Sequence, residues 1–267
     1  MIDTKDPADH RALTRLDGRG IIVLGAGGEG MGTATARLLA AAGARVMCVD
    51  IREDLASAVA DEVGGEAYAA NVTDRTEMEK LFAHADRVFG KHFAGLVDIV
   101  GGGGRGRLAS FDDAAIDQLL ALNLRQALLA IQIGAPILAA RGGGTMAFVG
   151  SIAGIAVAPG QPIYAMAKAG LHHLVRQAAD EFGPRGVRLN VVAPGVVERE
   201  RWADKADMLS RIAGETPLRR VGNVRDVANV LYFLMTDLSS YMTGTVLNVD
   251  GGKMIGANLP RTQADED

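Results

Sequence analysis

The chain has 267 residues, of which 48% are hydrophobic and 22% are charged; these values are ordinary for a folded domain with a full core. Its net charge of −4 gives no electrostatic reason to expect nucleic acid as a partner. The single cysteine, Cys48, excludes an internal disulfide framework and favours a reducing compartment. No run approaches the roughly 18 apolar residues that span a bilayer, and the charged N-terminus lacks the apolar core of a secretion signal. We therefore expect a cytoplasmic protein without membrane association.

The two ends of the chain differ from its middle. Residues 1–17 and the tail 257–267 are predicted to be poorly ordered ends or interface arms. No repeat, low-complexity segment or Pro/Ser-rich linker divides the residues between them. The sequence therefore predicts a single domain over residues 18–256.

Within this domain, short apolar runs alternate with longer helix-like segments such as 32–43 and 114–140. Near-continuous apolar runs are typical of parallel strands that are covered on both faces. The alternation predicts an α/β fold with a doubly wound parallel sheet flanked by helices. In such sheets ligands bind at the carboxyl ends of the strands. The predicted strands are residues 20–25, 44–50, 66–70, 95–100, 144–150, 187–193 and 245–249.

The first predicted strand runs directly into the glycine-rich turn GAGGEGMG, residues 25–32, and then into a helix. Gly25, Gly27 and Gly30 fit the pattern G-x-G-x-x-G in this strand–turn–helix context. Glycines let backbone amides approach a pyrophosphate, which the helix N-terminus also attracts. A turn without a ligand is the alternative. Asp50, which ends the second strand, favours a dinucleotide, because a carboxylate there accepts hydrogen bonds from the ribose.

The same region bears on the choice between NAD and NADP. Asp50 and Glu29 would repel the 2′-phosphate of NADP, by about 4 kcal/mol for one close pair at intermediate dielectric. Arg52 argues the other way, because a guanidinium two residues beyond Asp50 can reach a phosphate. Solvated surface arginines are common, so the sequence favours NAD.

Three polar residues follow the fifth predicted strand: Ser151, Tyr164 and Lys168. Tyr164 and Lys168 are four residues apart, so on a helix they share a face. An ammonium near a phenol lowers the phenol pKa from its usual value of about 10. The pair could then exchange a proton at neutral pH. The alternative is an amphipathic pair whose lysine extends to solvent.

With the glycine turn, Ser151 and the segment YAMAK ending at Lys168, the sequence resembles the short-chain dehydrogenase/reductase family over about residues 18–252. The resemblance implies a Rossmann-type domain and a catalytic tetrad of Asn123, Ser151, Tyr164 and Lys168. Tyr164 would be the general acid and base, and Ser151 would hold the substrate oxygen. Lys168 would lower the phenol pKa and bind the nicotinamide ribose, while Asn123 would anchor a water.

The resemblance further implies an NAD-dependent oxidoreductase that interconverts a secondary alcohol and a ketone. It implies a homodimer or homotetramer that pairs through the helices around 112–140 and 161–183. The adjacent His172 and His173 lack ligand spacing, so we expect no metal. The residues expected to bind the cofactor are Gly25, Gly27, Glu29, Gly30, Met31, Gly32, Asp50, Ile51, Asn71, Val72, Val100, Gly101, Tyr164, Lys168, Pro194, Gly195 and Val197.

The sequence departs from the family pattern near the cofactor. Leu24 stands where Thr is usual, and the turn from Gly25 to Gly30 is one residue longer than usual. Residues 98–101, Asp-Ile-Val-Gly, replace the usual Asn-Asn-Ala-Gly, and a threonine common after Pro194-Gly195 is missing. Two alternatives therefore stay open: an NADPH-dependent 3-ketoacyl-type reductase, and a dinucleotide-binding sensor without catalysis.

A charged segment at about residues 196–216 follows the sixth predicted strand. Its apolar side is predicted to be Trp202, Met208, Leu209 and Ile212, opposite Lys205 and Asp207. By resemblance it is a helical lid over the substrate, whose closure excludes water. The alternative is a surface helix that packs permanently on the core.

Overall fold

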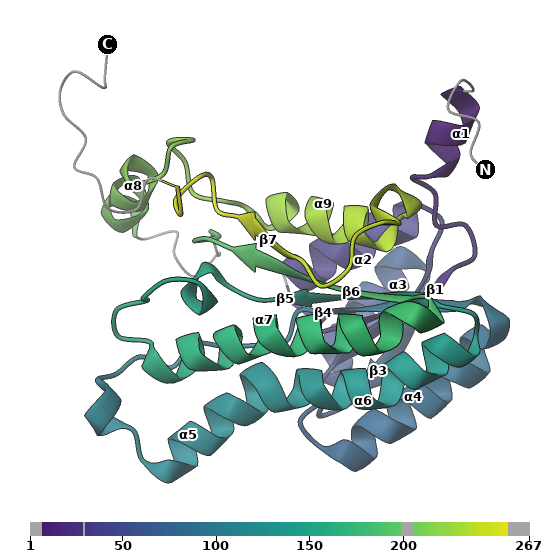
Figure 1. Cartoon of the computed structure of the whole chain (residues 1–267), viewed down its shortest axis with the longest axis horizontal. Coiled ribbons are helices and arrows are strands. Elements are labelled where there is room, and N and C mark those ends of the chain that lie inside the picture. Colours follow the sequence, from purple (N-terminus) through teal and green to yellow (C-terminus); the bar gives the residue numbers. More distant parts are fainter. Residues whose placement is uncertain (1–6, 29, 199–204, 256–267) are drawn as a thin grey trace.

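The computed structural model describes residues 7–28, 30–198 and 205–255. One parallel sheet lies between two layers of helices, and the helix α8 (Ala206–Gly214) lies apart from both layers (Figure 1).

The sheet has seven strands in the order β3-β2-β1-β4-β5-β6-β7, and all neighbouring strands are parallel. The order reverses between β1 and β4, which places the switch point of a doubly wound sheet at their carboxyl ends. The predicted fold class and strand number are confirmed. The strands are β1 (Gly20–Leu24), β2 (Arg45–Asp50), β3 (Glu66–Ala69), β4 (Phe93–Asp98), β5 (Gly144–Val149), β6 (Val187–Pro194) and β7 (Val246–Val249).

The central strands are buried on both faces. In β1, Ile22 and Leu24 belong to one apolar cluster, whereas Ile21 and Val23 belong to a second cluster on the opposite face. Successive side chains of a strand point to opposite faces, so a strand between two helix layers must be apolar throughout. This requirement explains the uninterrupted apolar runs in the sequence. Cys48 lies in the second cluster and is fully buried, as expected.

Helices cover both faces of the sheet. In Figure 1, α2, α3 and α9 lie above the sheet, and α4, α6 and α7 lie below it. The two layers bury the two clusters against opposite faces. The larger helices are α2 (Met31–Ala41), α3 (Glu53–Val63), α4 (Arg75–Phe89), α5 (Asp113–Leu120), α6 (Gln126–Ala140), α7 (Pro162–Phe182) and α9 (Val224–Met235).

Helices α5 and α6 are continuous through a π-helical segment at Ala121–Arg125, which has i→i+5 geometry. Among the described residues, the span Asp113–Ala140 is the one helix long and apolar enough to cross a membrane by length and composition. It packs against α7 and, through α6, against α4 and the strands β4 and β5. We therefore interpret it as a core helix of the domain.

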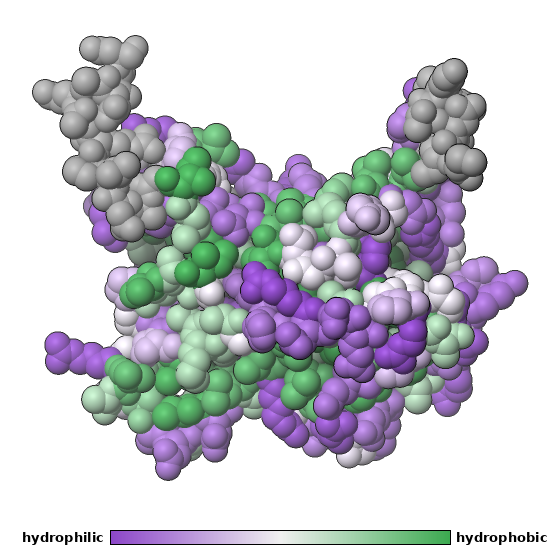
Figure 2. Space-filling view, in the orientation of Figure 1, coloured by the Kyte–Doolittle hydropathy of each residue, from purple (hydrophilic) through white to green (hydrophobic). Residues whose placement is uncertain are grey.

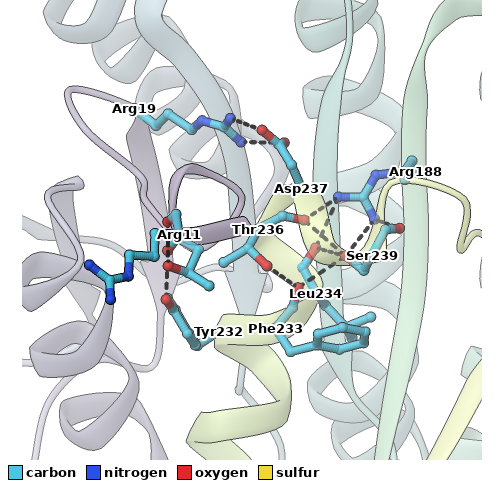
Figure 3. Close-up of polar contacts among 10 residues, drawn as sticks. Arg11, Arg19, Arg188, Tyr232, Phe233, Leu234, Thr236, Asp237 and Ser239 are labelled. Carbon is cyan, nitrogen blue, oxygen red and sulfur yellow. Dashed lines mark hydrogen bonds and ion pairs between the residues drawn. The ribbon is translucent and has the colours of Figure 1, made fainter. Parts of the chain in front are cut away.

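The described part of the N-terminal segment, from residue 7 onwards, packs against the domain. The short helix α1 (Pro7–Ala12) precedes Leu16, whose side chain is fully buried in the second cluster. The Tyr232 hydroxyl donates to the Thr14 carbonyl oxygen at 2.5 Å, a contact drawn in Figure 3. These contacts attach the segment to α9.

A polar cluster around Arg188 ties the amino ends of the strands to the C-terminus of α9 (Figure 3). Arg188, near the start of β6, donates to the carbonyl oxygens of Leu234 at 3.0 Å and Ser239 at 2.9 Å. The hydroxyl of Ser239 donates to the same turn of α9. Beside it, Arg19 and Asp237 form two hydrogen bonds of 2.9 and 2.6 Å. The last carbonyls of α9 thus accept hydrogen bonds from side chains.

Candidate active site

A cavity of about 540 Å³ opens at the carboxyl ends of β1, β2 and β4, beside the glycine turn. Gly25 and Gly28 both have φ of +76°, a conformation that favours glycine. A Cβ on Gly32 would lie 1.9 Å from the carbonyl oxygen of Gly25. The backbone therefore lies open to the cavity only because these positions carry no side chain. Helix α2 begins at Met31 and directs its N-terminus to this place, as anion binding requires.

Asp50, at the end of β2, closes one side of the cavity. Its carboxylate accepts hydrogen bonds of 3.1 Å from the backbone amides of Gly27 and Arg52. A Cβ on Gly27 would lie 2.7 Å from the same carboxylate. The side chain of Arg52 is paired with Asp54. The Arg52 guanidinium, which could bind the 2′-phosphate of NADP, is therefore already paired with the Asp54 carboxylate.

Most residues predicted to bind the cofactor line this cavity, whereas four do not. Pro194 and Gly195 lie at the end of β6, and Tyr164 and Lys168 lie on α7, all outside the cavity lining. Glu29 lies outside the described residues. The predicted residues that line the cavity are Gly25, Gly27, Gly30, Met31, Gly32, Asp50, Ile51, Asn71, Val72, Val100, Gly101 and Val197.

The cavity wall also includes residues that sequence reasoning missed. Gly28 lies within the glycine turn but outside the G-x-G-x-x-G positions, although it is one of the two turn glycines with positive φ. Thr73 follows the predicted Asn71 and Val72 directly, and Leu122 precedes Asn123. The sequence indicates these positions only through their adjacency to residues that were predicted to lie at the site. Val224 carried no signal, because it reaches the cavity from the distant helix α9.

Tyr164 and Lys168 lie on the first turns of α7 and face one another, as the i, i+4 spacing predicts. The Lys168 ammonium nitrogen is 5.8 Å from the centroid of the Tyr164 ring. Lys168 is 2% exposed and donates a 2.8 Å hydrogen bond to the carbonyl oxygen of Val149, at the end of β5. Burial lowers the pKa of Lys168 to about 8, and the charge of Asp98 opposes this shift.

The Asn123 side chain is fixed by hydrogen bonds close to Lys168. It lies in the π-helical segment and is fully buried. Its side-chain amide donates to the carbonyl oxygens of Gly102 at 2.8 Å and Leu119 at 2.9 Å, and its oxygen accepts from the Gly102 amide at 3.0 Å. A Cβ on Gly101 would lie 2.9 Å from the Asn123 oxygen and 3.0 Å from the Lys168 nitrogen. Gly101 therefore brings the loop after β4 against both side chains.

Ser151 lies just beyond β5 and precedes a short turn, Ile152–Gly154. Its hydroxyl oxygen accepts a 3.1 Å hydrogen bond from the Ala153 amide. The buried His172 approaches the Ser151 amide with its Nε2 at 3.5 Å. Burial and the charge of Lys168 lower the pKa of His172 to about 4, so the ring is neutral and can accept this bond. His172 thus has a structural place, one turn beyond Lys168.

Comparison with known proteins identifies the family. The family profile described as enoyl-(acyl carrier protein) reductase matches residues 25–253. The chain is 34% identical to the 3-oxoacyl-(acyl-carrier-protein) reductase of Thermotoga maritima, over 90% of this chain and 100% of that protein. It is 35% identical to the 7alpha-hydroxysteroid dehydrogenase of Escherichia coli K12, over 89% of this chain and 95% of that protein. The chain belongs to the short-chain dehydrogenase/reductase family.

A solved structure of the short-chain dehydrogenase/reductase family shows the same fold. A 7alpha-hydroxysteroid dehydrogenase in complex with NADH and 7-oxo glycochenodeoxycholic acid superposes with a TM-score of 0.84 and 33% identity. The match covers 91% of this chain and 96% of that one. The family consists of oxidoreductases with a nicotinamide dinucleotide cofactor, and the glycine cavity of this chain fits such a group. Among the residues that the structure describes, no group of His, Cys, Asp or Glu could hold a metal.

Proposed function

We propose that this short-chain dehydrogenase/reductase uses NAD to interconvert a secondary alcohol and a ketone, with Tyr164 as general acid and base. The observation that carries the proposal is the Tyr164–Lys168 pair, with the ammonium 5.8 Å from the phenol ring. This pair lies beside Gly101, which also lines the cofactor cavity. The reacting groups and the cofactor cavity are therefore adjacent.

The bound nicotinamide supplies one kind of chemistry, acceptance or donation of a hydride. The protein's own residues handle the proton. Tyr164 takes the hydroxyl proton of an alcohol, or returns it to a ketone oxygen, and the positive charge of Lys168 stabilises the phenolate form. Ser151 holds the substrate oxygen by a hydrogen bond and fixes its distance from Tyr164. Asn123 keeps the loop at Gly102 and the helix turn at Leu119 in one arrangement.

Preference for NAD follows from Asp50. Its carboxylate is anchored on two backbone amides, so it cannot turn away from a 2′-phosphate. Arg52 is paired with Asp54, so its charge does not cancel the repulsion between Asp50 and the 2′-phosphate of NADP. Steady-state kinetics with both cofactors test this preference. A higher kcat/KM with NADP than with NAD would overturn it.

The reaction itself is tested by a screen of secondary alcohols and ketones that follows NADH absorbance. We expect turnover with a subset of substrates in wild type and its loss in Tyr164→Phe. Turnover by neither protein, together with tight NADH binding, would favour a dinucleotide-binding sensor instead.

A second candidate is an NADPH-dependent 3-ketoacyl-type reductase. The 34% identity to a 3-oxoacyl-(acyl-carrier-protein) reductase favours it, because that relative is matched over its full length. A 3-ketoacyl thioester in the screen, offered with NADPH and with NADH, separates the two candidates. We expect the thioester to be a poor substrate with NADPH.

We also propose that residues 196–216 act as a substrate lid. Helix α8 has no fully buried residue; Met208, Leu209 and Ile212 are half-buried, opposite the exposed Lys205 and Asp207. A helix packed permanently on a core buries its apolar side more completely. Trp202, predicted to lie on the same apolar side, falls outside the described residues.

As the only tryptophan of the chain, Trp202 reports on closure. Its fluorescence should change when NADH and a substrate analogue bind together, beyond the change with NADH alone. An unchanged signal, with equal protease resistance of residues 198–215 in the free and ternary states, rules out the lid.

The protein is further proposed to be a cytoplasmic homodimer or homotetramer. Apolar surface extends over α5 and the start of α7 in Figure 2, and Met166 on α7 is 52% exposed. Association of the α5–α6 and α7 helices between copies would remove this surface from water. Light scattering at micromolar concentration should give the mass of a dimer or tetramer, and a monomeric mass would contradict the proposal.

A further inference from the structure

A carboxylate is buried at the end of β4, directly below the candidate active site. Asp98 is 2% exposed, and it stands where the family usually has asparagine. Its Oδ1 accepts a 3.0 Å hydrogen bond from the Val100 amide, and its Oδ2 accepts a 2.8 Å bond from the Gln126 side chain. The two donors fix the carboxylate inside the sheet, where a charge needs compensation.

Gln126, the partner of Asp98, is itself incompletely satisfied. Its Oε1 is, within the described residues, the one buried side-chain oxygen or nitrogen without a hydrogen-bond partner. Buried polar atoms are almost always paired, so this orphan indicates a special requirement. The Gln126 side chain donates through its nitrogen to the Asp98 carboxylate, and this orientation leaves its oxygen without a partner. An ionised carboxylate only accepts hydrogen bonds, so it requires this orientation of the amide.

Lys168 reaches the same end of the neighbouring strand. Asp98 pairs with Phe148 across β4 and β5, and the next residue of β5, Val149, accepts the 2.8 Å hydrogen bond from the Lys168 ammonium. Asp98 and Lys168 are each 2% exposed, and the charge of each acts on the other. Burial raises the pKa of Asp98 to about 6 and lowers that of Lys168 to about 8. Between these two values both groups are ionised, and their attraction opposes the cost of burial.

Among the described residues, the other elements packed around Asp98 contribute no second charged side chain that faces it. Its strand neighbours are Leu24 on β1 and Phe148 on β5, both apolar. From the α5–α6 span come the uncharged Asn123 and Gln126, and Arg125 is turned away to the Thr73 carbonyl. On α7, Tyr164 and His172 lie beside Lys168; Tyr164 faces its ammonium, and His172 is neutral at its pKa of about 4.

We propose that Asp98 is a positioning residue that acts through Lys168: its buried carboxylate keeps the Lys168 ammonium charged at neutral pH and so sets the pH range of proton exchange at Tyr164. The second half of this statement rests on the proposed function, whereas the first half does not. Removal of a buried negative charge lowers the proton affinity of every group near it. Replacement of Asp98 should therefore lower the pKa of Lys168 and move the pH–activity profile to lower pH.

Asp98→Asn is the sharpest variant, because it removes the charge and keeps the shape. The new side-chain amide can still accept from Val100, and it can donate to Gln126 Oε1 once that amide turns. Folding should thus be retained. Asp86→Asn is the matched control, since Asp86 pairs with Arg141 at the surface, on α4.

The first readout needs no turnover: the ¹³Cε shift of Lys168 in lysine-labelled protein is titrated, with its signal assigned by its loss in Lys168→Arg. We expect the Lys168 pKa to fall by at least about one unit in Asp98→Asn and to stay unchanged in Asp86→Asn. The second readout is the pH dependence of kcat/KM for alcohol oxidation. Its decline at high pH, where Lys168 loses its proton, should begin at lower pH in Asp98→Asn alone.

An unchanged Lys168 titration in Asp98→Asn overturns the inference, even if Tyr164→Phe has confirmed the reaction. A shifted titration in a protein without turnover keeps the Asp98–Lys168 coupling and rejects only the proposed function. Should Asp98→Asn fail to fold, Gln126→Met decides. Loss of the amide donor raises the pKa of Asp98 towards the range in which Lys168 titrates, so the Lys168 titration should shift to lower pH than in wild type. Coincidence at every pH would overturn the inference.

Discussion

The two ends of the sheet are built on opposite principles. At the amino ends of the strands, Arg188 is surrounded by carbonyl and hydroxyl oxygens, and Asp237 is matched to Arg19. At the carboxyl ends, Asp98 and Lys168 are buried at 2% exposure each, and Gln126 keeps an orphaned oxygen. One end satisfies its polar groups and stabilises the fold. The other keeps incompletely compensated charges, which is typical of functional sites.

Individual glycines differ in how strictly they are required, and positive φ occurs at both ends of the sheet, for example at Gly143 and Gly186 before β5 and β6. The turn after β1 contains two glycines with φ of +76° and a third, Gly32, that touches backbone. At the opposite end, α7 ends at Gly183, where φ is −54° and a Cβ would meet nothing within 4 Å. Glycine is thus required at these positions of the turn after β1, whereas Gly183 is replaceable. The following predictions use this contrast, from the largest expected effect to the smallest.

Loss of Arg188 should destabilise the fold and leave the site intact. Arg188→Met removes several hydrogen bonds that a charged donor makes to carbonyl oxygens such as that of Leu234. We expect the free energy of unfolding to fall by about 3 kcal/mol, measured by urea denaturation, with the Kd for NADH unchanged. Arg141→Met, which breaks a surface pair with Asp86, should cost about 1 kcal/mol or less. Equal losses in the two variants would contradict the contrast between the ends.

Replacement of the buried pair should have the opposite effect on stability. Asp98→Asn with Lys168→Met should raise the free energy of unfolding at pH 7 by about 2 kcal/mol, because an apolar or neutral replacement avoids the cost of buried charge. The activity should be lost.

The pH dependence of this gain has a defined sign. The pKa of Asp98 is raised to about 6, so wild-type stability rises as pH falls from about 6 towards 4. The pKa of Lys168 is lowered to about 8, so wild-type stability also rises as pH increases from about 8 towards 10. The gain in the double variant should therefore be largest between pH 6 and 8, as thermal unfolding at each pH would show. A gain independent of pH would mean that folding shifts the pKa of neither group.

The glycine contrast is tested by a matched pair of alanine variants. In Gly32→Ala the new Cβ would collide with the Gly25 carbonyl, 1.9 Å away, and so push the turn out of place. We expect the Kd for NADH to rise at least tenfold, about 1.4 kcal/mol, by isothermal titration. Gly183→Ala should bind NADH as wild type does. Wild-type affinity in both variants would show that the turn does not hold the cofactor.

Much of this arrangement follows from sequence, because burial on both faces leaves an uninterrupted apolar run at each inner strand. All seven predicted strands are found, with ends that differ by no more than two residues. Tyr164 and Lys168 face one another because their spacing fixes a shared helix face. The pattern selected Gly25, Gly27 and Gly30 in the glycine turn, whereas positive φ falls on Gly25 and Gly28.

Other features have no local signal. The π-helical segment at Ala121–Arg125 cannot be seen in a composition that equally suits an α-helix. Leu16 lies in a charged segment without apolar periodicity, and it is buried in the cluster that includes residues of α9, more than 200 residues later. Asp98 and Gln126 are separated by 28 residues and two elements. Their pairing, and the orphaned oxygen that accompanies it, exist only once the sheet and α6 are packed.

The central claim, that Tyr164 exchanges the proton of the reaction, is tested most directly by kcat of Tyr164→Phe with the best substrate from the screen. The variant keeps the ring and removes only the hydroxyl. We expect kcat to fall by about 10²–10⁴-fold, while the Kd for NADH and the unfolding temperature stay at their wild-type values. A kcat equal to that of wild type would contradict the account.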